Sequence, residues 1–395
     1  IALIRAEGSV SDRMKESVLQ ADFLFDGLAG TGLNGPLRGV ALSLVELANR
    51  SPACKIAIDT PSGVSEDVVV SSPHFQADLC VTFGRRKVAM FHPFTRSACG
   101  EIIVKNPSFP PQLLEESPVM ANLYTLADIS LEKLSSSSYK NSRGHLGIVG
   151  GSKEYTGAAR LSARSAFASR AGLVTLYCDE EVYPIAAAEL PSVMVRILDH
   201  VVDLSRYGAL LVGPGWGKGR SSLLESILSL GKRIVLDADG ITAYATLLQE
   251  KKSISHGPLI MTPHLGELKT LATALYGELP EDTPLAFFSM IQEVADRLDA
   301  TLVIKSSLVH IATPGKKHLA VVEGLNPSLG VAGSGDVLSG VIAALLAGGM
   351  ELQEASLLGV LLHQKAGAVA HAKYGYYDSE TLVECLGQVI MEVER

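Results

Sequence analysis

Short apolar runs alternate with amphipathic stretches along the first part of the chain. ADFLFDGLAGTGL (21–33) and CKIAIDTPSGV (54–64) each predict a strand that ends in a Gly-rich turn, whereas GVALSLVELANR (39–50) has helical spacing. The runs 77–91 and 100–104 predict further strands. This alternation favours a parallel α/β sheet, whose ligands bind where the strands end. Asp26 and Asp59 fall at two such ends.

A second α/β series begins after a stretch rich in proline and serine. PSFPPQLLEESP (107–118) and LEKLSSSSYKNSRG (131–144) are typical of an interdomain connection. Strand-like runs then recur, with a helix expected over 157–172 and helices from 335 onward. We expect the Gly-rich turns at 150–152, 213–217 and 333–336 to follow strands directly. The pattern predicts two α/β domains, 1–115 and 141–395, joined by a linker over 116–140.

Composition and charge narrow the choice of partners. Of the 395 residues, 47% are hydrophobic and 19% charged, which indicates a globular protein. The net charge of −8 and an aromatic content of 6% argue against binding nucleic acid. An anionic ligand must therefore be held locally, by backbone amides and a few cations.

The cysteines and the longest apolar runs indicate a cytoplasmic protein. Five cysteines are scattered without a C-x-x-C pair, which suits a reducing compartment and disfavours a zinc site. Runs such as VLSGVIAALLAGG are too short to span a bilayer. The chain opens at Ile1 on what resembles the inside of a domain, so we expect the natural N-terminus to be missing.

The stretch AGSGDVLSG (332–340) places glycines and one carboxylate before a buried helix. Asp336 could be the N-cap of that helix, because Asp accepts the unpaired N–H bonds of a first turn. Alternatively, the glycines let backbone N–H groups close around a phosphate.

From residue 144 onward the chain resembles the ADP-dependent NAD(P)H-hydrate dehydratases of the ribokinase-like superfamily. The resemblance rests on GIVGGSKEYTGAA, VGPGWG, VLDAD, TPHLGEL and AGSGDVLSG, which occur in that order. It implies a ribokinase-like α/β/α domain that expels water from a hydrated nicotinamide ring, with ADP as phosphoryl donor and Mg²⁺ neutralising charge. Asp336 would be the general base, and the amides of 333–336 would stabilise the phosphate charge.

The resemblance also implies further site residues, each with a plainer alternative. Glu267 would organise metal or phosphate, or be only an acid at a helix N-terminus. Asp237 and Asp239 would lie near the mouth of the site, or cap the following helix. The implied substrate contacts, which could instead be structural residues, are Ala158, Gly215, Gly217 and His264. The implied nucleotide contacts are Gly333, Ser334, Gly335 and Lys305, followed by Ser306, Ser307, Leu308 and Val309 where the family has Gly-Ala, a small residue and Thr.

The first half resembles the NAD(P)H-hydrate epimerase domain, a Rossmann-like domain, in FDGLAGTGLNGPLRG and IAIDTPSGV. By this resemblance Asp26 and Ser62 would hold K⁺ and Asp59 would contact the reacting ring, although strand-end carboxylates also cap turns. The substrate phosphates would lie on Gly30, Thr31, Gly32, Leu33, Asn34, Gly35 and Pro36. The family's upstream Asn-Asn-Gly-Gly-Asp-Gly loop is not in this sequence, so we expect an incomplete epimerase domain.

The function predicted from these motifs is nicotinamide nucleotide repair. Its partners would be NADH or NADPH hydrate and ADP, with neither nucleic acid nor membrane, in a homo-oligomer. Two alternatives are a ribokinase-like kinase of a small hydroxylated vitamin precursor, which would release a stable phosphorylated product, and a non-catalytic nucleotide-binding regulator.

Overall fold

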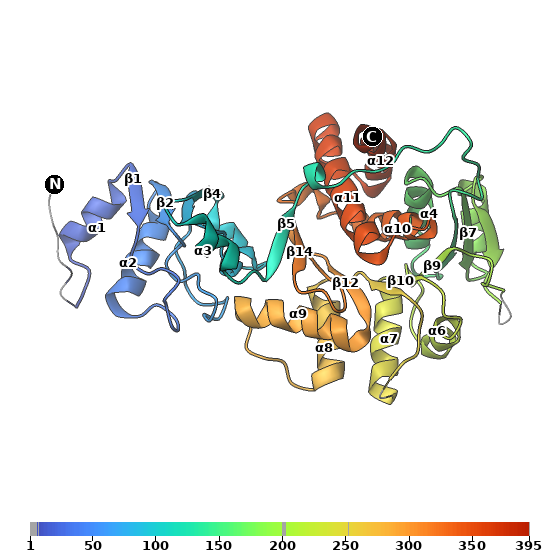
Figure 1. Cartoon of the computed structure of the whole chain (residues 1–395), viewed down its shortest axis with the longest axis horizontal. Coiled ribbons are helices and arrows are strands. Elements are labelled where there is room, and N and C mark those ends of the chain that lie inside the picture. Colours follow the sequence, from blue (N-terminus) through green and yellow to red (C-terminus); the bar gives the residue numbers. More distant parts are fainter. Residues whose placement is uncertain (1–5, 7, 200–202, 252, 395) are drawn as a thin grey trace. The chain divides into compact units, whose positions relative to one another are not determined.

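The computed structural model of the chain describes residues 6, 8–199, 203–251 and 253–394 (Figure 1). The chain divides into two compact units. The first comprises Ile1–Ala121 with Pro280–Met290, and the second comprises Asn122–Leu279 with Ile291–Arg395.

The first unit is built on a four-stranded parallel sheet in the order β1-β2-β3-β4. Its strands are β1 (Phe23–Asp26), β2 (Cys54–Ile58), β3 (Leu79–Phe83) and β4 (Glu101–Lys105). Its helices are α1 (Asp12–Leu19), α2 (Gly39–Arg50) and α3 (Pro111–Glu116), with the 3₁₀ turns η1 (Val88–Phe91) and η2 (Arg96–Cys99).

One face of this sheet is apolar and solvent-exposed. Phe23 and Phe25 alternate along β1 and are 61% and 67% exposed, and Ile58 on β2 is 43% exposed. The register pairs Phe25 with Ile56, which places Ile58 on the same side as the two phenylalanines. Parallel sheets are normally covered on both faces.

The second unit contains a ten-stranded sheet in the order β5-β14-β13-β12-β11-β10-β9-β6-β7-β8. Neighbours from β8 to β12 are parallel, and β13 is antiparallel to both β12 and β14. The strands are β5 (Ala121–Tyr124), β6 (His145–Val149), β7 (Leu173–Cys178), β8 (Met194–Ile197), β9 (Ala209–Val212), β10 (Ile234–Leu236), β11 (Leu259–Met261), β12 (Ala300–Ile304), β13 (Leu308–Ala312) and β14 (Leu319–Glu323).

Helices lie on both sides of this sheet (Figure 1). On one side α10 (Ser334–Ala347) packs against α4 (Ala158–Ala168), α11 (Leu352–Tyr374) and the strands beneath. Every residue of α10 from Val337 to Ala347 is buried, because the helix is apolar all round. The other helices are α5 (Tyr183–Glu189), α6 (Ser221–Leu228), α7 (Asp239–Glu250), α8 (Leu265–Tyr276) and α12 (Ser379–Val393), together with α9 (Pro284–Leu298), of which only the part from Ile291 onward belongs to this unit.

Most elements lie where the hydrophobic pattern predicts them. The helix predicted over 39–50 is α2, and each predicted strand run contains a strand. Within the predicted linker, residues 121–124 form β5 at the edge of the large sheet. The expectation that the turn at 333–336 follows a strand directly is wrong. The 3₁₀ turn η4 (Pro327–Leu329) lies between β14 and α10, because the chain must cross from β14, near one end of the sheet, to the helix that packs on its central strands.

Candidate active site

The carboxyl ends of the parallel strands in the second unit bring distant motifs together. Asp237 follows β10, His264 follows β11 and Lys305 follows β12. His264 and Lys305 also form an isolated parallel bridge that extends the pairing of their strands. Ligands of such sheets bind at this edge.

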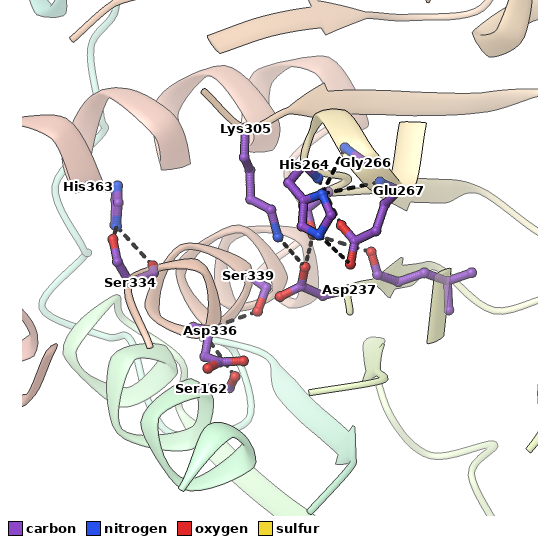
Figure 2. A network of polar contacts seen from close by, with 12 residues as sticks. Ser162, Asp237, His264, Gly266, Glu267, Lys305, Ser334, Asp336, Ser339 and His363 are labelled. Carbon is purple, nitrogen blue, oxygen red and sulfur yellow. Dashed lines mark hydrogen bonds and ion pairs between the residues drawn. The ribbon is translucent and has the colours of Figure 1, made fainter. Parts of the chain in front are cut away.

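A buried ion pair forms the centre of the site (Figure 2). Lys305 Nζ lies 2.6 Å from Asp237 Oδ1, and Thr262 Oγ1 donates to the same oxygen at 2.7 Å. Asp237 is 1% exposed. Burial disfavours the charge on Lys305, but the carboxylates of Asp237 and Glu267 outweigh this cost and raise the pKa of the ammonium.

Asp336 lies in the first turn of α10, beside this pair. The N-cap is Gly333, so the interpretation of Asp336 as the N-cap is wrong. Its backbone oxygen accepts hydrogen bonds from Ser162 Oγ at 2.9 Å and Ser339 Oγ at 3.1 Å. Burial and the neighbouring carboxylate of Asp237 outweigh the attraction of Lys305 and raise the pKa of Asp336 to about 7. A carboxyl with this pKa can take up a proton near neutral pH.

The start of α10 has the geometry of an anion-binding corner. Gly333 adopts φ +88°, and a Cβ there would lie 2.5 Å from Leu161 Cδ1, so the turn requires glycine. The N–H groups of Ser334 and Val337 are used internally, donating to Val331 O at 3.2 Å and Gly333 O at 3.0 Å. Of the amides expected to bind phosphate, those of Gly333, Gly335 and Asp336 are left without a backbone acceptor among the described residues.

Lys305 adds a positive charge to this corner. A Cβ on Gly335 would lie 3.4 Å from Lys305 Nζ, so the ammonium stands directly beside the first turn of α10. Backbone donors at a helix N-terminus together with an ammonium group favour phosphate.

A buried histidine holds the first residue of α10. His363, on α11, lies with Nε2 3.0 Å from Ser334 O and 3.1 Å from Ser334 Oγ (Figure 2). Burial lowers its pKa to about 4. Sequence reasoning missed this residue, because α11 is apolar on most sides and nothing local distinguishes His363 from a core position.

His264 has a structural role, and its second ring nitrogen, Nε2, lies 3.7 Å from Glu267 Oε1. It is the N-cap of α8, where Nδ1 accepts from Gly266 N at 2.9 Å and Glu267 N at 3.1 Å. Glu267 Oε2 accepts from His264 N at 2.8 Å and completes a capping box. Because Nδ1 is an acceptor, Nε2 carries the hydrogen, and the side chain is 59% exposed. His264 can therefore cap the helix and still donate to a ligand.

The glycine turn after β9 packs too closely for any side chain. A Cβ on Gly213 would lie 1.9 Å from Asp237 O, and one on Gly215 would lie 2.7 Å from Tyr155 O and 3.1 Å from Ala158 Cβ. The structure thus brings Ala158 and Gly215, two of the implied substrate contacts, close together.

The far end of the same turn is hydrogen-bonded to Asp239, in the first turn of α7. Gly217 N donates to Asp239 Oδ2 at 2.8 Å, so this carboxylate holds the turn. The N-cap of α7 is Ala238, so neither Asp237 nor Asp239 is the cap. Trp216, between the two glycines, is fully buried.

The segment after Lys305 reaches the site only in part. Ser306 and Ser307 form the turn between β12 and β13, and Leu308 N donates to Ser306 Oγ at 3.2 Å. Leu308 and Val309 begin β13 and are 0% and 4% exposed. Their side chains belong to the core, so only their backbone could face a nucleotide.

In the first unit Asp26 and Ser62 bind each other. Ser62 Oγ donates to Asp26 Oδ1 at 2.6 Å and Ser62 N to Asp26 Oδ2 at 2.7 Å, while Leu28 N donates to Oδ1 at 3.3 Å. The predicted phosphate loop begins just beyond. Gly35 adopts φ +88°, whereas a Cβ on Gly30 or Gly32 would meet open space. The loop's other members, Thr31, Leu33, Asn34 and Pro36, are exposed or half-buried, and Ser65 Oγ donates to Leu33 O at 3.1 Å.

Asp59 adopts a left-handed backbone and contacts a lysine that sequence reasoning missed. Its φ is +72°, a conformation that is uncommon for residues other than glycine and occurs at functional sites. Asp59 Oδ1 accepts from Lys87 Nζ, from Thr82 Oγ1 at 3.3 Å and from Phe83 N at 3.2 Å. The run GRRK after β3 was the available signal for Lys87.

The described residues contain no group of three or more His, Cys, Asp or Glu side chains that could hold a metal ion. Among the helices that the structure describes, none is long and apolar enough to span a bilayer.

The fold and site define a ribokinase-like α/β protein. A ribokinase-like superfamily protein from Enterococcus faecalis V583 superposes with a TM-score of 0.61 at 25% identity, covering 69% of this chain and 96% of that one. The ADP/ATP-dependent NAD(P)H-hydrate dehydratase from Bacillus subtilis, co-crystallised with ATP and Mg²⁺, has the same fold, with a TM-score of 0.59 at 23% identity over 67% and 95% of the two chains.

Comparison of sequences defines the family. The profile of the NAD(P)H-hydrate dehydratase family matches residues 146–388, and that of the YjeF-related protein N-terminus matches residues 2–89. A bifunctional NAD(P)H-hydrate repair enzyme from Thermofilum pendens is 32% identical over 94% of this chain and 72% of its own length. One from Moorella thermoacetica is 30% identical over 91% and 70%. The chain belongs to the NAD(P)H-hydrate dehydratase family, with an N-terminal YjeF-related part.

Proposed function

We propose that the second unit dehydrates the S epimer of NADH or NADPH hydrate, using ADP and releasing AMP and phosphate. The observation that carries this proposal is Asp336, a half-buried carboxyl with a pKa of about 7 at the start of α10, beside Lys305. Family membership and the bifunctional repair relatives support the choice of substrate.

The proposed mechanism uses the side chains in separate roles. Asp336 takes the proton of the ring hydroxyl, and the oxygen attacks the terminal phosphorus of ADP while the bond to AMP breaks. The amides of Gly335 and Asp336 and the ammonium of Lys305 stabilise the charge on the transferred phosphoryl group. The lone pair of the ring nitrogen then expels phosphate, and loss of a proton from the neighbouring ring carbon C5 to solvent restores the dihydronicotinamide.

Mg²⁺ fits this site as a companion of the nucleotide. The described residues offer no cage of three acidic or imidazole ligands, and Mg²⁺ is commonly held by one or two carboxylates together with substrate phosphates. Glu267, adjacent to Lys305, is the carboxylate that would contact it through water. The ion would supply neutralisation of phosphate charge.

For the first unit we propose interconversion of the two epimers of the hydrate. Asp59, held by Lys87, Thr82 and Phe83 N, would contact the reacting ring, and the loop from Gly30 to Pro36 would bind the substrate phosphates. Asp26 and Ser62, which the family resemblance assigns to K⁺, hydrogen-bond each other. K⁺ stays a prediction without a step in the mechanism.

A direct assay tests the proposal. The protein is incubated with the separated epimers of NADPH hydrate and either ADP or ATP, and the return of reduced-nicotinamide absorbance is followed together with released phosphate. Stoichiometric recovery of NADPH and phosphate from the S epimer is expected. Nucleotide turnover that yields a stable phosphorylated product would instead establish a kinase, and absence of turnover would establish a binding protein.

A further inference from the structure

The contact between α11 and the start of α10 contains a neutral histidine in a fixed tautomer. His363 is 6% exposed, and its Nε2 lies 3.0 Å from a carbonyl oxygen, that of Ser334. A carbonyl can only accept, so Nε2 must carry the hydrogen. Because burial lowers the pKa of His363 to about 4, the imidazole is neutral throughout the physiological range.

This tautomer determines whether the Ser334 hydroxyl donates or accepts in its hydrogen bond with His363. Nε2–H also lies 3.1 Å from Ser334 Oγ, so the hydroxyl oxygen is an acceptor there and keeps its own hydrogen for another acceptor. We assign that acceptor to the neighbouring corner, where Lys305 Nζ stands beside Gly335, the residue that follows Ser334.

The backbone N–H of Ser334 cannot donate to an acceptor in this corner. Ser334 N donates to Val331 O at 3.2 Å, so the first residue of α10 offers the corner its hydroxyl and not its N–H. A corner built from Gly335 N–H, Asp336 N–H and the Ser334 hydroxyl has three donors of defined direction. Only the hydroxyl can rotate, and His363 restricts that rotation.

We propose that His363 is a positioning residue that orients the Ser334 hydroxyl to donate to the transferred phosphoryl group. The inference rests on the proposed function of this site. Misdirecting a donor aimed at developing charge lowers the rate of the chemical step more than it weakens binding of the ground state.

The test compares two replacements of His363. His363→Leu removes the donor, whereas His363→Gln places an amide N–H₂ within similar reach. We expect His363→Leu to lower kcat for ADP-dependent dehydration by about 10- to 100-fold with KM for the hydrate changed less than about twofold. His363→Gln should recover most of the loss, which a purely steric role would not produce. Ser356→Ala, another buried polar residue of α11, is the matched control and should retain the parent kcat.

A double variant tests whether His363 acts through Ser334. Ser334→Ala combined with His363→Leu should be no slower than the slower single variant, because both remove one donor. If the fold-losses in kcat of the two single variants multiply in the double variant, the inference is overturned. A kcat for His363→Leu equal to that of the parent would overturn it as well.

Binding of inorganic phosphate separates this inference from the proposed function. Phosphate should raise the melting temperature of the parent and of His363→Gln, and raise it less in His363→Leu and Ser334→Ala. If the parent binds phosphate in this pattern but does not dehydrate the hydrate, the proposed function fails and the role of His363 stands. Equal shifts in all variants would overturn the role of His363.

Discussion

At the scale of the residue, we expect Asp336 to affect both the rate of ADP-dependent dehydration and the stability of the fold. Asp336→Asn keeps the size of the side chain but cannot accept the substrate proton, so ADP-dependent dehydration should fall by about 10²- to 10⁴-fold. In the folded protein Asp336 keeps its proton up to about pH 7. In the unfolded chain its carboxyl has a pKa near 3.8 and has already lost the proton at that pH. The carboxyl therefore destabilises the fold progressively from pH 4 to 7 and by a constant amount above.

It follows that Asp336→Asn should melt at or above the parent temperature at pH 7.5, with the difference shrinking toward pH 4. Parallel melting curves and NADPH recovery assays check both parts. A variant that dehydrates at close to the parent rate would remove Asp336 from the mechanism.

The raised pKa of Asp336 also predicts the pH profile of the parent enzyme. Since the base must be ionised, kcat/KM should rise with pH up to about 7 and then level off. The measurement is initial rate against pH at limiting hydrate and saturating ADP. A profile that is flat from pH 5.5 to 8 would show that Asp336 does not accept the proton.

Lys305 is predicted to matter for stability as well as for chemistry. Lys305→Met leaves Asp237 buried and unpaired, which typically costs about 3–5 kcal/mol of unfolding free energy. The double variant Lys305→Met, Asp237→Asn removes the uncompensated charge and should recover much of this loss, while activity stays low in both. Denaturant melts compare the three proteins, and equal stability of the single and double variants would contradict the pairing.

At the scale of elements, the site depends on how closely α10 approaches α4. A Cβ on Gly340 would lie 2.1 Å from Ser165 Oγ and 2.4 Å from Ser162 O, and the Ser162 hydroxyl donates to Asp336 O one turn earlier. Gly340→Ala should therefore separate the helices, at a cost of about 1–3 kcal/mol, and displace Asp336.

Gly387, in the middle of α12, provides the matched control for this prediction. A Cβ there would meet nothing within 4 Å, so Gly387→Ala should stabilise the helix by up to about 1 kcal/mol and leave the rate unchanged. Thermal melts and dehydration rates of the two variants compare the same chemical change in a tight and an open setting. Similar behaviour of both would show that the contact between α4 and α10 tolerates a side chain.

The sequence predicted the positions of strands and helices better than it predicted contacts between distant residues. Continuous apolar runs such as those of β9, β10 and β11 are sufficient to locate strands buried on both faces, and Asp237 and His264 were placed at strand ends by that pattern alone. Pairings across the fold were not predictable. Lys305 reaches Asp237 from 68 positions away and His363 reaches Ser334 from 29, and such contacts depend on how strands and helices stack.

At the scale of the whole molecule, the two units should act as separate sites. Asp59→Asn suits the left-handed backbone, which Asn adopts more readily than most residues, so the first unit should stay folded. ADP-dependent dehydration of the S epimer should then change by less than about twofold, a range in which distant sites show little coupling. If the protein recovers NADPH from the R epimer, that recovery should slow. Loss of both activities together would show that the units are not independent.

The single tryptophan of the chain gives these experiments a built-in optical signal. Trp216 lies between Gly215 and Gly217, in the turn that Asp239 holds through Gly217 N. Its emission should be that of an indole shielded from water, and a ligand that shifts the turn should change it without any label. Because the first unit contains no tryptophan, loss of this emission on heating follows the second unit alone, whereas circular dichroism follows both. A difference between the two melting curves would give each unit its own transition temperature.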